Sequence, residues 1–127
     1  LPERTCITHS LPIHGYDYNT DWTNPSHVYG TDIEKIHKLD EAGNTSLSDL
    51  LHLSKNQIIW AVREEMAMTV EDVLARRSRA LFLNAEAALA LAPKVAKIIA
   101  EESGQNQDWI DQQIKEFKHL TQNYLLS

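Results

Sequence analysis

The chain has little of several features that catalytic and exported proteins use. Cys6 is the single cysteine among 127 residues, so an intramolecular disulfide cannot form. A reducing, cytoplasmic compartment fits this cysteine usage best. The four glycines lie at positions 15, 30, 43 and 104, too far apart for the glycine-rich loop of a phosphate or dinucleotide site. No apolar run approaches the roughly 18 residues that a membrane-spanning helix needs.

The charge balance narrows the class of partner further. The formal net charge is -6, whereas nucleic-acid binding requires a basic surface that displaces counterions. We therefore expect no nucleic-acid partner. No charged leader followed by an apolar segment is visible, so we expect no secretory signal. The sequence starts at Leu1 and not at Met, which we interpret as a truncated or processed chain cut from a larger protein.

Two unlike parts follow one another along the chain. Residues 1–30 contain three of the four prolines and no sustained period of 3.6 residues, which predicts an irregular lead-in. Residues 31–127 show helical periodicity throughout, without strand-like alternation. The length suffices for one domain with a hydrophobic core. The predicted fold is an all-α bundle of about five helices, preceded by an irregular N-terminal segment.

Capping residues predict where the first helices begin. Thr31, with Glu34 three residues later, predicts a capping box and a helix that ends at Gly43. Ser54 predicts the start of a second helix that runs to about Met68.

Further capping residues mark the second half of the chain. Thr69 and Asp72 form another capping box, and Asn84 is the next N-cap candidate. Pro93 predicts a break or kink in the alanine-rich helix that Gly104 ends. The last helix begins near Asn106 or Gln107, and its apolar positions follow helical spacing in the order Ile110, Ile114, Phe117, Leu120 or Thr121, and Tyr124.

Two possible metal sites are weak. Residues 17–21 imitate the start of a calcium loop, but Trp22 replaces the turn glycine and Val28 replaces the bidentate glutamate. An Asx-rich turn explains the same residues. Cys6, His9 and His14 lie close together, yet a zinc site needs a fourth ligand and usually a second cysteine. We expect no metal site here, and nothing supports Cys6 as a nucleophile.

The arginines are the most distinctive feature. Four of the five occur in residues 60–79 of an acidic chain: Arg63, Arg76, Arg77 and Arg79. Asp72 and Arg76 are four residues apart and can pair on one helix face. One interpretation is a structural ion-pair network that joins two adjacent helices. The other is a docking surface for the carboxylates of a partner or for a phosphate. The residues themselves leave both open.

Residues 60–79 and 81–87 resemble a characteristic sequence pattern of one protein family. The pattern "WAVREEMAMTVEDVLARRSR", followed by "LFLNAEA", is similar to that of the C-terminal domain of FAD-dependent (aerobic) glycerol-3-phosphate dehydrogenases and α-glycerophosphate oxidases. Ser78 stands where that pattern usually has threonine. Residues 6–15 look like the segment that joins the catalytic part to this domain, and the last helix fits the family's end. The resemblance thus spans nearly the whole chain.

The resemblance implies a parent enzyme that oxidises sn-glycerol 3-phosphate to dihydroxyacetone phosphate. FAD would accept the hydride there and pass electrons to quinone or to oxygen. The flavin-binding glycine motif lies upstream in the family, so the resemblance implies no catalytic, cofactor-binding or metal-binding residue in this chain. Residues 1–30 would be the linker from that upstream FAD domain, and residues 31–127 the helical C-terminal domain.

The expected role is therefore to pack against the upstream FAD domain, with homo-oligomerisation left open. The isolated chain is expected to be inactive. Arg63, Arg76, Arg77 and Arg79 are candidates for a domain contact or a phosphate-facing surface. We expect a cytoplasmic location, with the parent enzyme peripheral at the inner face of a membrane as a further option. The alternative function is a free-standing helical interaction module that binds through its arginine-rich face.

Overall fold

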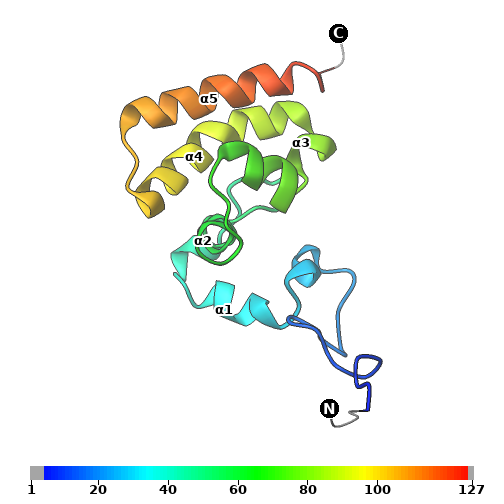
Figure 1. The fold of residues 1–127 in the computed structure, drawn as a ribbon. Coiled ribbons are helices and arrows are strands. Elements are labelled where there is room, and N and C mark those ends of the chain that lie inside the picture. Colours follow the sequence, from blue (N-terminus) through cyan, green and yellow to red (C-terminus); the bar gives the residue numbers. More distant parts are fainter. Residues whose placement is uncertain (1–4, 126–127) are drawn as a thin grey trace. The chain divides into compact units, whose positions relative to one another are not determined.

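The structure is a computed structural model that describes residues 5–125 (Figure 1). These residues contain helices and turns without a β-strand, which confirms the predicted all-α class. The chain divides into two compact units, Leu1–Lys35 and Ile36–Ser127. The first four residues of the predicted lead-in, including Leu1, lie outside the described residues.

The N-terminal unit consists of turns followed by a 3₁₀ helix, η1, over Pro25–Asp32. This helix begins inside the segment predicted to be irregular. Its start follows from local chemistry: the side chain of Asn24 accepts a hydrogen bond from the Ser26 N–H, and Pro25 occupies the first helical position.

Gly30 interrupts η1 with a positive φ of 50°. The neighbouring Thr31 N–H donates to the carbonyl of Gly15, with an N–O distance of 3.1 Å. A Cβ atom at Gly30 would collide with that same carbonyl group. Both the backbone conformation and the close approach therefore require glycine at position 30.

The helix predicted from Thr31 to Gly43 is wrong in its bounds. Thr31 lies inside η1, and the α-helix that follows, α1, spans only Ile33–His37. A single 3₁₀ turn, η2, covers Ala42–Asn44. The side chain of Asn56 explains the irregular path, because its Nδ2 atom donates to three oxygens of this segment: Ile36 O at 3.0 Å, Asp40 O at 2.7 Å and Asn44 Oδ1 at 2.9 Å.

Helix α2 spans Lys55–Glu64, and its predicted start is confirmed. The Ser54 hydroxyl accepts from the Gln57 N–H, while the Gln57 side chain accepts from the Ser54 N–H. The helix ends four residues before the predicted Met68. Met66 takes the left-handed conformation at φ 55°, and the Ala67 N–H reaches back to the Ala61 carbonyl at 2.9 Å, so the chain turns away there.

A π-helical segment, η3, follows over Asp72–Arg77. The predicted capping box at its start is confirmed. The Asp72 N–H donates to the Thr69 hydroxyl oxygen, and the Asp72 carboxylate accepts from the Thr69 N–H. The Ser78 N–H bonds to the carbonyl of Val73, five residues back, at 3.0 Å, which is the wider spacing of a π-helix.

Two α-helices come next, α3 over Ala80–Leu83 and α4 over Ala85–Ser103. The Asn84 side chain accepts from the Ala87 N–H, so this predicted N-cap is confirmed. The break predicted at Pro93 is wrong, since α4 continues through it. Pro93 itself is exposed, while Leu91, Ala92, Val95 and Ala96 around it are buried. Core packing on both sides of the proline thus holds the helix together despite one missing hydrogen bond.

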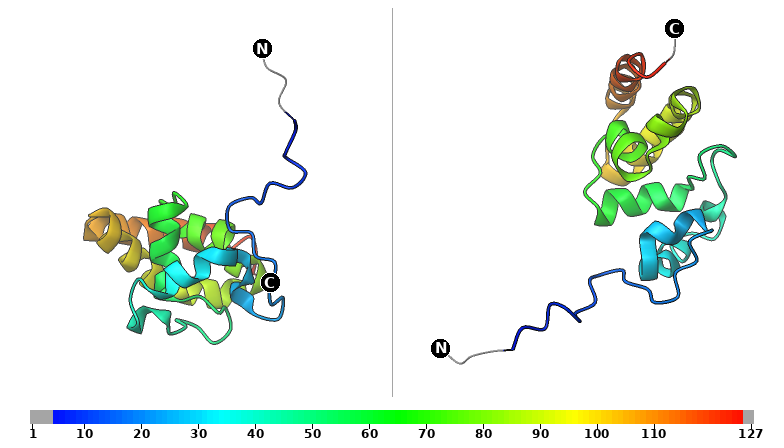
Figure 2. Two further views of the ribbon diagram at one scale, coloured as in Figure 1. Left: turned by 90° about the horizontal axis from the view of Figure 1, so that it is seen from below. Right: turned by 90° about the vertical axis from the view of Figure 1, so that its right-hand side faces the viewer.

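Helix α5 spans Gln107–Thr121, with Asn106 as the confirmed N-cap. Gly104, at φ 69°, ends α4 as predicted. The short connection makes α4 and α5 antiparallel neighbours, whereas α2 runs across them (Figures 1 and 2). Tyr124 lies beyond the end of α5, in a turn closed by its N–H to the Thr121 carbonyl at 2.9 Å.

The core of the second unit lies between α2, η3, α4 and α5. Its largest fully buried apolar side chains are Ile58, Val70, Val73, Leu74, Leu81, Val95, Ile99 and Phe117. Gln113 of α5 is also buried, and its Oε1 accepts from the Val70 N–H at 3.1 Å, which satisfies a donor at the start of the η3 turn. No helix in the described part of the chain combines the length and apolarity needed to cross a membrane.

Candidate functional site: the arginine segment between α2 and α3

Arg63 lies near the end of α2 and binds a carboxylate from another helix. Its Nε donates to Oε2 of Glu102, near the end of α4, at 2.6 Å. This hydrogen bond, together with the charge of Glu102, raises the pKa of Arg63. Glu102 lies at the negative end of the α4 dipole, where an acidic side chain is unfavourable without a cation. The pair therefore joins α2 to α4 and neutralises that end of α4.

Arg76 pairs with two acids of its own segment. Its Nη2 lies 2.7 Å from Glu71 Oε1, and its Nη1 lies 3.3 Å from Asp72 Oδ1. The second contact confirms the pair predicted from the spacing of Asp72 and Arg76. The hydrogen bond to Glu71 is the main reason why the pKa of Arg76 is raised.

Asp72 is the most heavily bonded acid of this segment. Partial burial opposes its charged form, but the N–H groups of Met68 and Thr69, the Thr69 hydroxyl and Arg76 outweigh that effect. The result is a lowered pKa for Asp72. Its carboxylate therefore anchors the start of the η3 turn in the ionised form.

Arg77 ties η3 back to the end of α2. Its Nη2 donates to the backbone carbonyl of Glu65 at 2.6 Å, and its Nε lies 3.5 Å from Oε2 of the same residue. One guanidinium thus holds both the main chain and the side chain of Glu65. The connection from α2 to η3, which contains the exposed side chains of Met66 and Met68, is fixed at its base by this contact.

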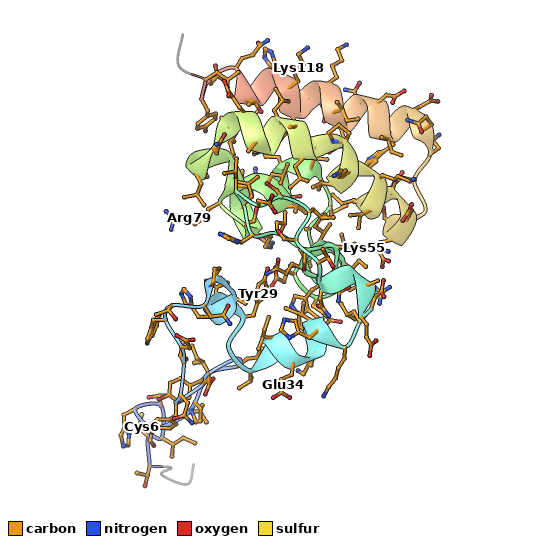
Figure 3. All side chains as sticks on the ribbon, turned by 180° about the vertical axis from the view of Figure 1, so that it is seen from behind. Cys6, Tyr29, Glu34, Lys55, Arg79 and Lys118 are labelled. Atoms are coloured by element: carbon orange, nitrogen blue, oxygen red, sulfur yellow. The ribbon has the colours of Figure 1, made fainter. Side chains whose placement is uncertain are left out.

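Arg79 differs from the other three arginines. It takes the left-handed conformation at φ 58° as the residue before α3. Within residues 5–125 its side chain has no hydrogen bond or ion pair. Figure 3 shows the side chain extending away from the helices. Arg79 follows the C-terminal end of η3, where a helix dipole favours a cation, and precedes the N-terminus of α3, where it does not. The two effects oppose each other, so the dipoles do not explain this arginine.

The other candidates from the sequence have local explanations. Asp17 and Asp21 accept hydrogen bonds from the N–H groups of Asn19 and Thr23, each at 2.9 Å, which are the predicted Asx turns. No cluster of three or more potential metal-ligating side chains occurs among the residues that the structure describes. Cys6 is exposed, and its contact with the Thr8 hydroxyl lowers the pKa of its thiol.

His14, which the sequence groups with Cys6 and His9 as a weak zinc candidate, instead pairs with Asp32. Its Nε2 donates to Oδ2 of Asp32 at 2.5 Å, and Lys35 Nζ donates to Oδ1 at 2.7 Å. The bond from Lys35, and then that from His14, holds the pKa of Asp32 below its usual range although burial acts in the opposite direction. His14 therefore has a structural partner in Asp32.

Two hollows among the residues that the structure describes lack the features of a flavin dinucleotide site. One, of about 190 Å³, is lined by Asp17, Asp21 and other polar side chains of the N-terminal unit, and its acidic groups would repel a pyrophosphate. Another, of about 310 Å³, lies open to solvent between Leu50 and Lys94. Lys94 is the single cation among the residues that line it, and none of these residues is glycine, whereas dinucleotide sites use a glycine-rich turn at a helix N-terminus.

Sequence reasoning missed the partners of two arginines. Glu102 is 39 residues away from Arg63, and no local spacing connects them. The backbone carbonyl of Glu65 is not visible as a ligand in any residue pattern. The exposure of Phe82 and Leu83 on α3 was not predicted either, because large apolar side chains in a helical segment are ordinarily assigned to its buried face.

Comparisons with known proteins agree on one family. The profile of the C-terminal domain of alpha-glycerophosphate oxidase matches residues 6–114. A Dictyostelium discoideum protein, described as a probable mitochondrial glycerol-3-phosphate dehydrogenase, is 29% identical over 138 residues, covering 94% of this chain and 21% of that protein. The chain thus spans about a fifth of this curated relative. No solved structure matches the chain. Because the family profile covers most of the sequence, the chain belongs to the family of C-terminal domains of alpha-glycerophosphate oxidase.

Proposed function

We propose that the chain is the accessory C-terminal domain of an FAD-dependent glycerol-3-phosphate dehydrogenase. The parent enzyme would oxidise sn-glycerol 3-phosphate to dihydroxyacetone phosphate, with FAD as the hydride acceptor. The family membership carries the proposal, since the matched relative is a probable glycerol-3-phosphate dehydrogenase. In that enzyme this chain would supply packing surface and no reacting group.

The N-terminal unit supports a packing role. Its apolar side chains are largely exposed: Ile7, Leu11, Ile13, Tyr16, Tyr18, Trp22 and Val28. A soluble monomer rarely exposes so many large apolar side chains in one segment, and such surface usually belongs to an interface. In the proposed enzyme this segment is the connection from the upstream FAD domain, and we propose that it lies along that domain.

Three of the four arginines have a structural role under this proposal. Arg63, Arg76 and Arg77 stabilise the helical unit through their carboxylate and carbonyl partners. These contacts favour structural ion pairs over a phosphate site, because a guanidinium already paired in this way is not free for a second anion.

The coding sequence upstream of Leu1 and the purified full-length protein test the proposal. The upstream part should encode a glycine-rich FAD domain in the same reading frame. The full-length protein should contain bound FAD and reduce an artificial electron acceptor when sn-glycerol 3-phosphate is added. An unrelated upstream domain, or a flavin-free full-length protein, would contradict the proposal and favour the free-standing interaction module.

A further inference from the structure

The surface around α3 combines exposed apolar side chains with an unpaired cation. Phe82 and Leu83 of α3 are 58% and 69% exposed. The ring of Tyr124, from the turn after α5, packs edge-on against Phe82 with centroids 5.6 Å apart. Arg79 lies directly before α3 and has no partner among the described residues. We call Arg79, Phe82, Leu83 and Tyr124 the α3 face.

The backbone at the α3 face departs from regular helix. The π-helical η3 precedes it. The backbone of Arg79 takes the left-handed conformation, which residues other than glycine seldom adopt. Segments of this kind persist where the surrounding structure holds them, and they concentrate at functional surfaces. At the α3 face, this irregular backbone positions Arg79 apart from the acidic side chains that pair with Arg63, Arg76 and Arg77.

We propose that the α3 face is the surface on which the upstream domain of the same polypeptide docks, with a carboxylate of that domain paired to Arg79. This inference rests on the proposed function. It adds the location of the contact and the chemistry of the partner surface, which must be apolar with one acidic group.

Charge favours this occupant over the alternatives. If two copies of the chain met through the α3 face with twofold symmetry, the same small surface would contact itself. The two Arg79 side chains would then lie close together and repel each other. A phosphate ligand usually recruits several cations, whereas Arg76 and Arg77 are bound to Glu71, Asp72 and Glu65. An apolar surface with one acidic group satisfies both the aromatic side chains and the single guanidinium. The matched relative has about four-fifths of its length outside the aligned region, which leaves room for such a domain.

A photo-cross-linking experiment on the full-length enzyme tests the assignment. Benzoylphenylalanine replaces Phe82 in one variant and Leu50 in the control, since Leu50 is 67% exposed on another part of the same unit. The probe at position 82 should link within one polypeptide to a peptide upstream of Leu1. A link to a second copy, absence of any link, or equal linking to that peptide from position 50 would overturn the assignment.

Charge reversal tests the role of Arg79 itself. In the position-82 variant, Arg79→Glu should lower the yield of the cross-link about five-fold, the effect of losing one ion pair. Arg79→Lys should restore most of the yield, and Lys118→Glu, the same charge change on exposed α5 surface (Figure 3), should leave it unchanged. An unchanged yield in Arg79→Glu, with a raised KM for sn-glycerol 3-phosphate, would assign Arg79 to the substrate phosphate and overturn the docking role.

The two proposals fail in different ways. If the upstream sequence encodes no flavin domain, the proposed function fails. If the enzyme carries FAD and oxidises its substrate while position 82 forms no intramolecular link, the α3 face alone is wrong.

Discussion

Arg63 of α2 and Glu102 of α4 form the ion pair that joins the ends of these two helices, with Nε and Oε2 2.6 Å apart. Glu102 is the more buried partner, at 18% side-chain exposure against 51% for Arg63. Removal of the arginine alone therefore leaves a half-buried carboxylate at the negative end of a helix.

The Arg63–Glu102 pair should show a measurable coupling. We expect Arg63→Met to destabilise the chain more than the double variant Arg63→Met with Glu102→Gln does, because the double change also removes the stranded charge. Urea unfolding of the two single variants and the double variant measures the coupling free energy. Salt at 1 M should weaken it by screening. Strictly additive effects at low salt would show that the pair contributes nothing.

Asp72 should make stability depend on pH. Its folded pKa is lowered, so its contribution is present above the unfolded pKa of about 4 and is lost as pH falls through the lower folded value. Asp72→Asn should cost about 1 to 2 kcal/mol at pH 7, the usual effect of losing charged hydrogen bonds at a helix start. Urea unfolding from pH 7 to pH 2 should show this difference shrinking at the acid end. A constant difference across that range would contradict the assignment.

Gly43 should not tolerate a side chain. A Cβ atom at this position would overlap the Asn56 amide, whose Oδ1 has no hydrogen-bond partner among the residues that the structure describes. We expect Gly43→Ala to cost about 1 to 3 kcal/mol through overpacking. In an Asn56→Ala background the same change should cost less, because the obstructing amide is absent. Equal costs in both backgrounds, measured by thermal unfolding, would refute this explanation.

Pro93 should be replaceable with a gain in stability. Because α4 runs through it, Pro93→Ala restores a helical N–H, which is worth up to about 3 kcal/mol. The more flexible unfolded chain offsets about 1 kcal/mol of this gain. We expect the free energy of unfolding to rise by about 1 to 2 kcal/mol. The melting temperature should rise accordingly. A lower melting temperature would mean that the proline relieves strain in α4.

The sequence predicted those helix starts that a side chain caps. Ser54, Thr69, Asn84 and Asn106 cap their own helices through short-range hydrogen bonds, and short-range chemistry is visible in sequence. The Asp72–Arg76 pair was predictable for the same reason. The all-α class followed from the period of the apolar residues.

Tertiary contacts decided what the sequence did not predict. The segment after α1 follows the buried amide of Asn56, which lies 12 to 20 residues away from its three acceptors. Helix α2 stops where Met66 turns, and the resulting connection is held by Arg77. Of the four arginines in residues 60–79, three have charged partners within residues 5–125 and Arg79 has none. The partners Glu102 and Glu65 are not revealed by any residue spacing.

The central claim, that this chain supplies packing surface while the flavin chemistry belongs to an upstream domain, is tested most directly by a fluorescence titration of FAD with the purified chain. The account predicts that flavin emission and absorbance stay unchanged at all protein concentrations, and that sn-glycerol 3-phosphate reduces no dye. Saturable quenching of the flavin at a one-to-one ratio, followed by loss of flavin absorbance when sn-glycerol 3-phosphate is added, would contradict it.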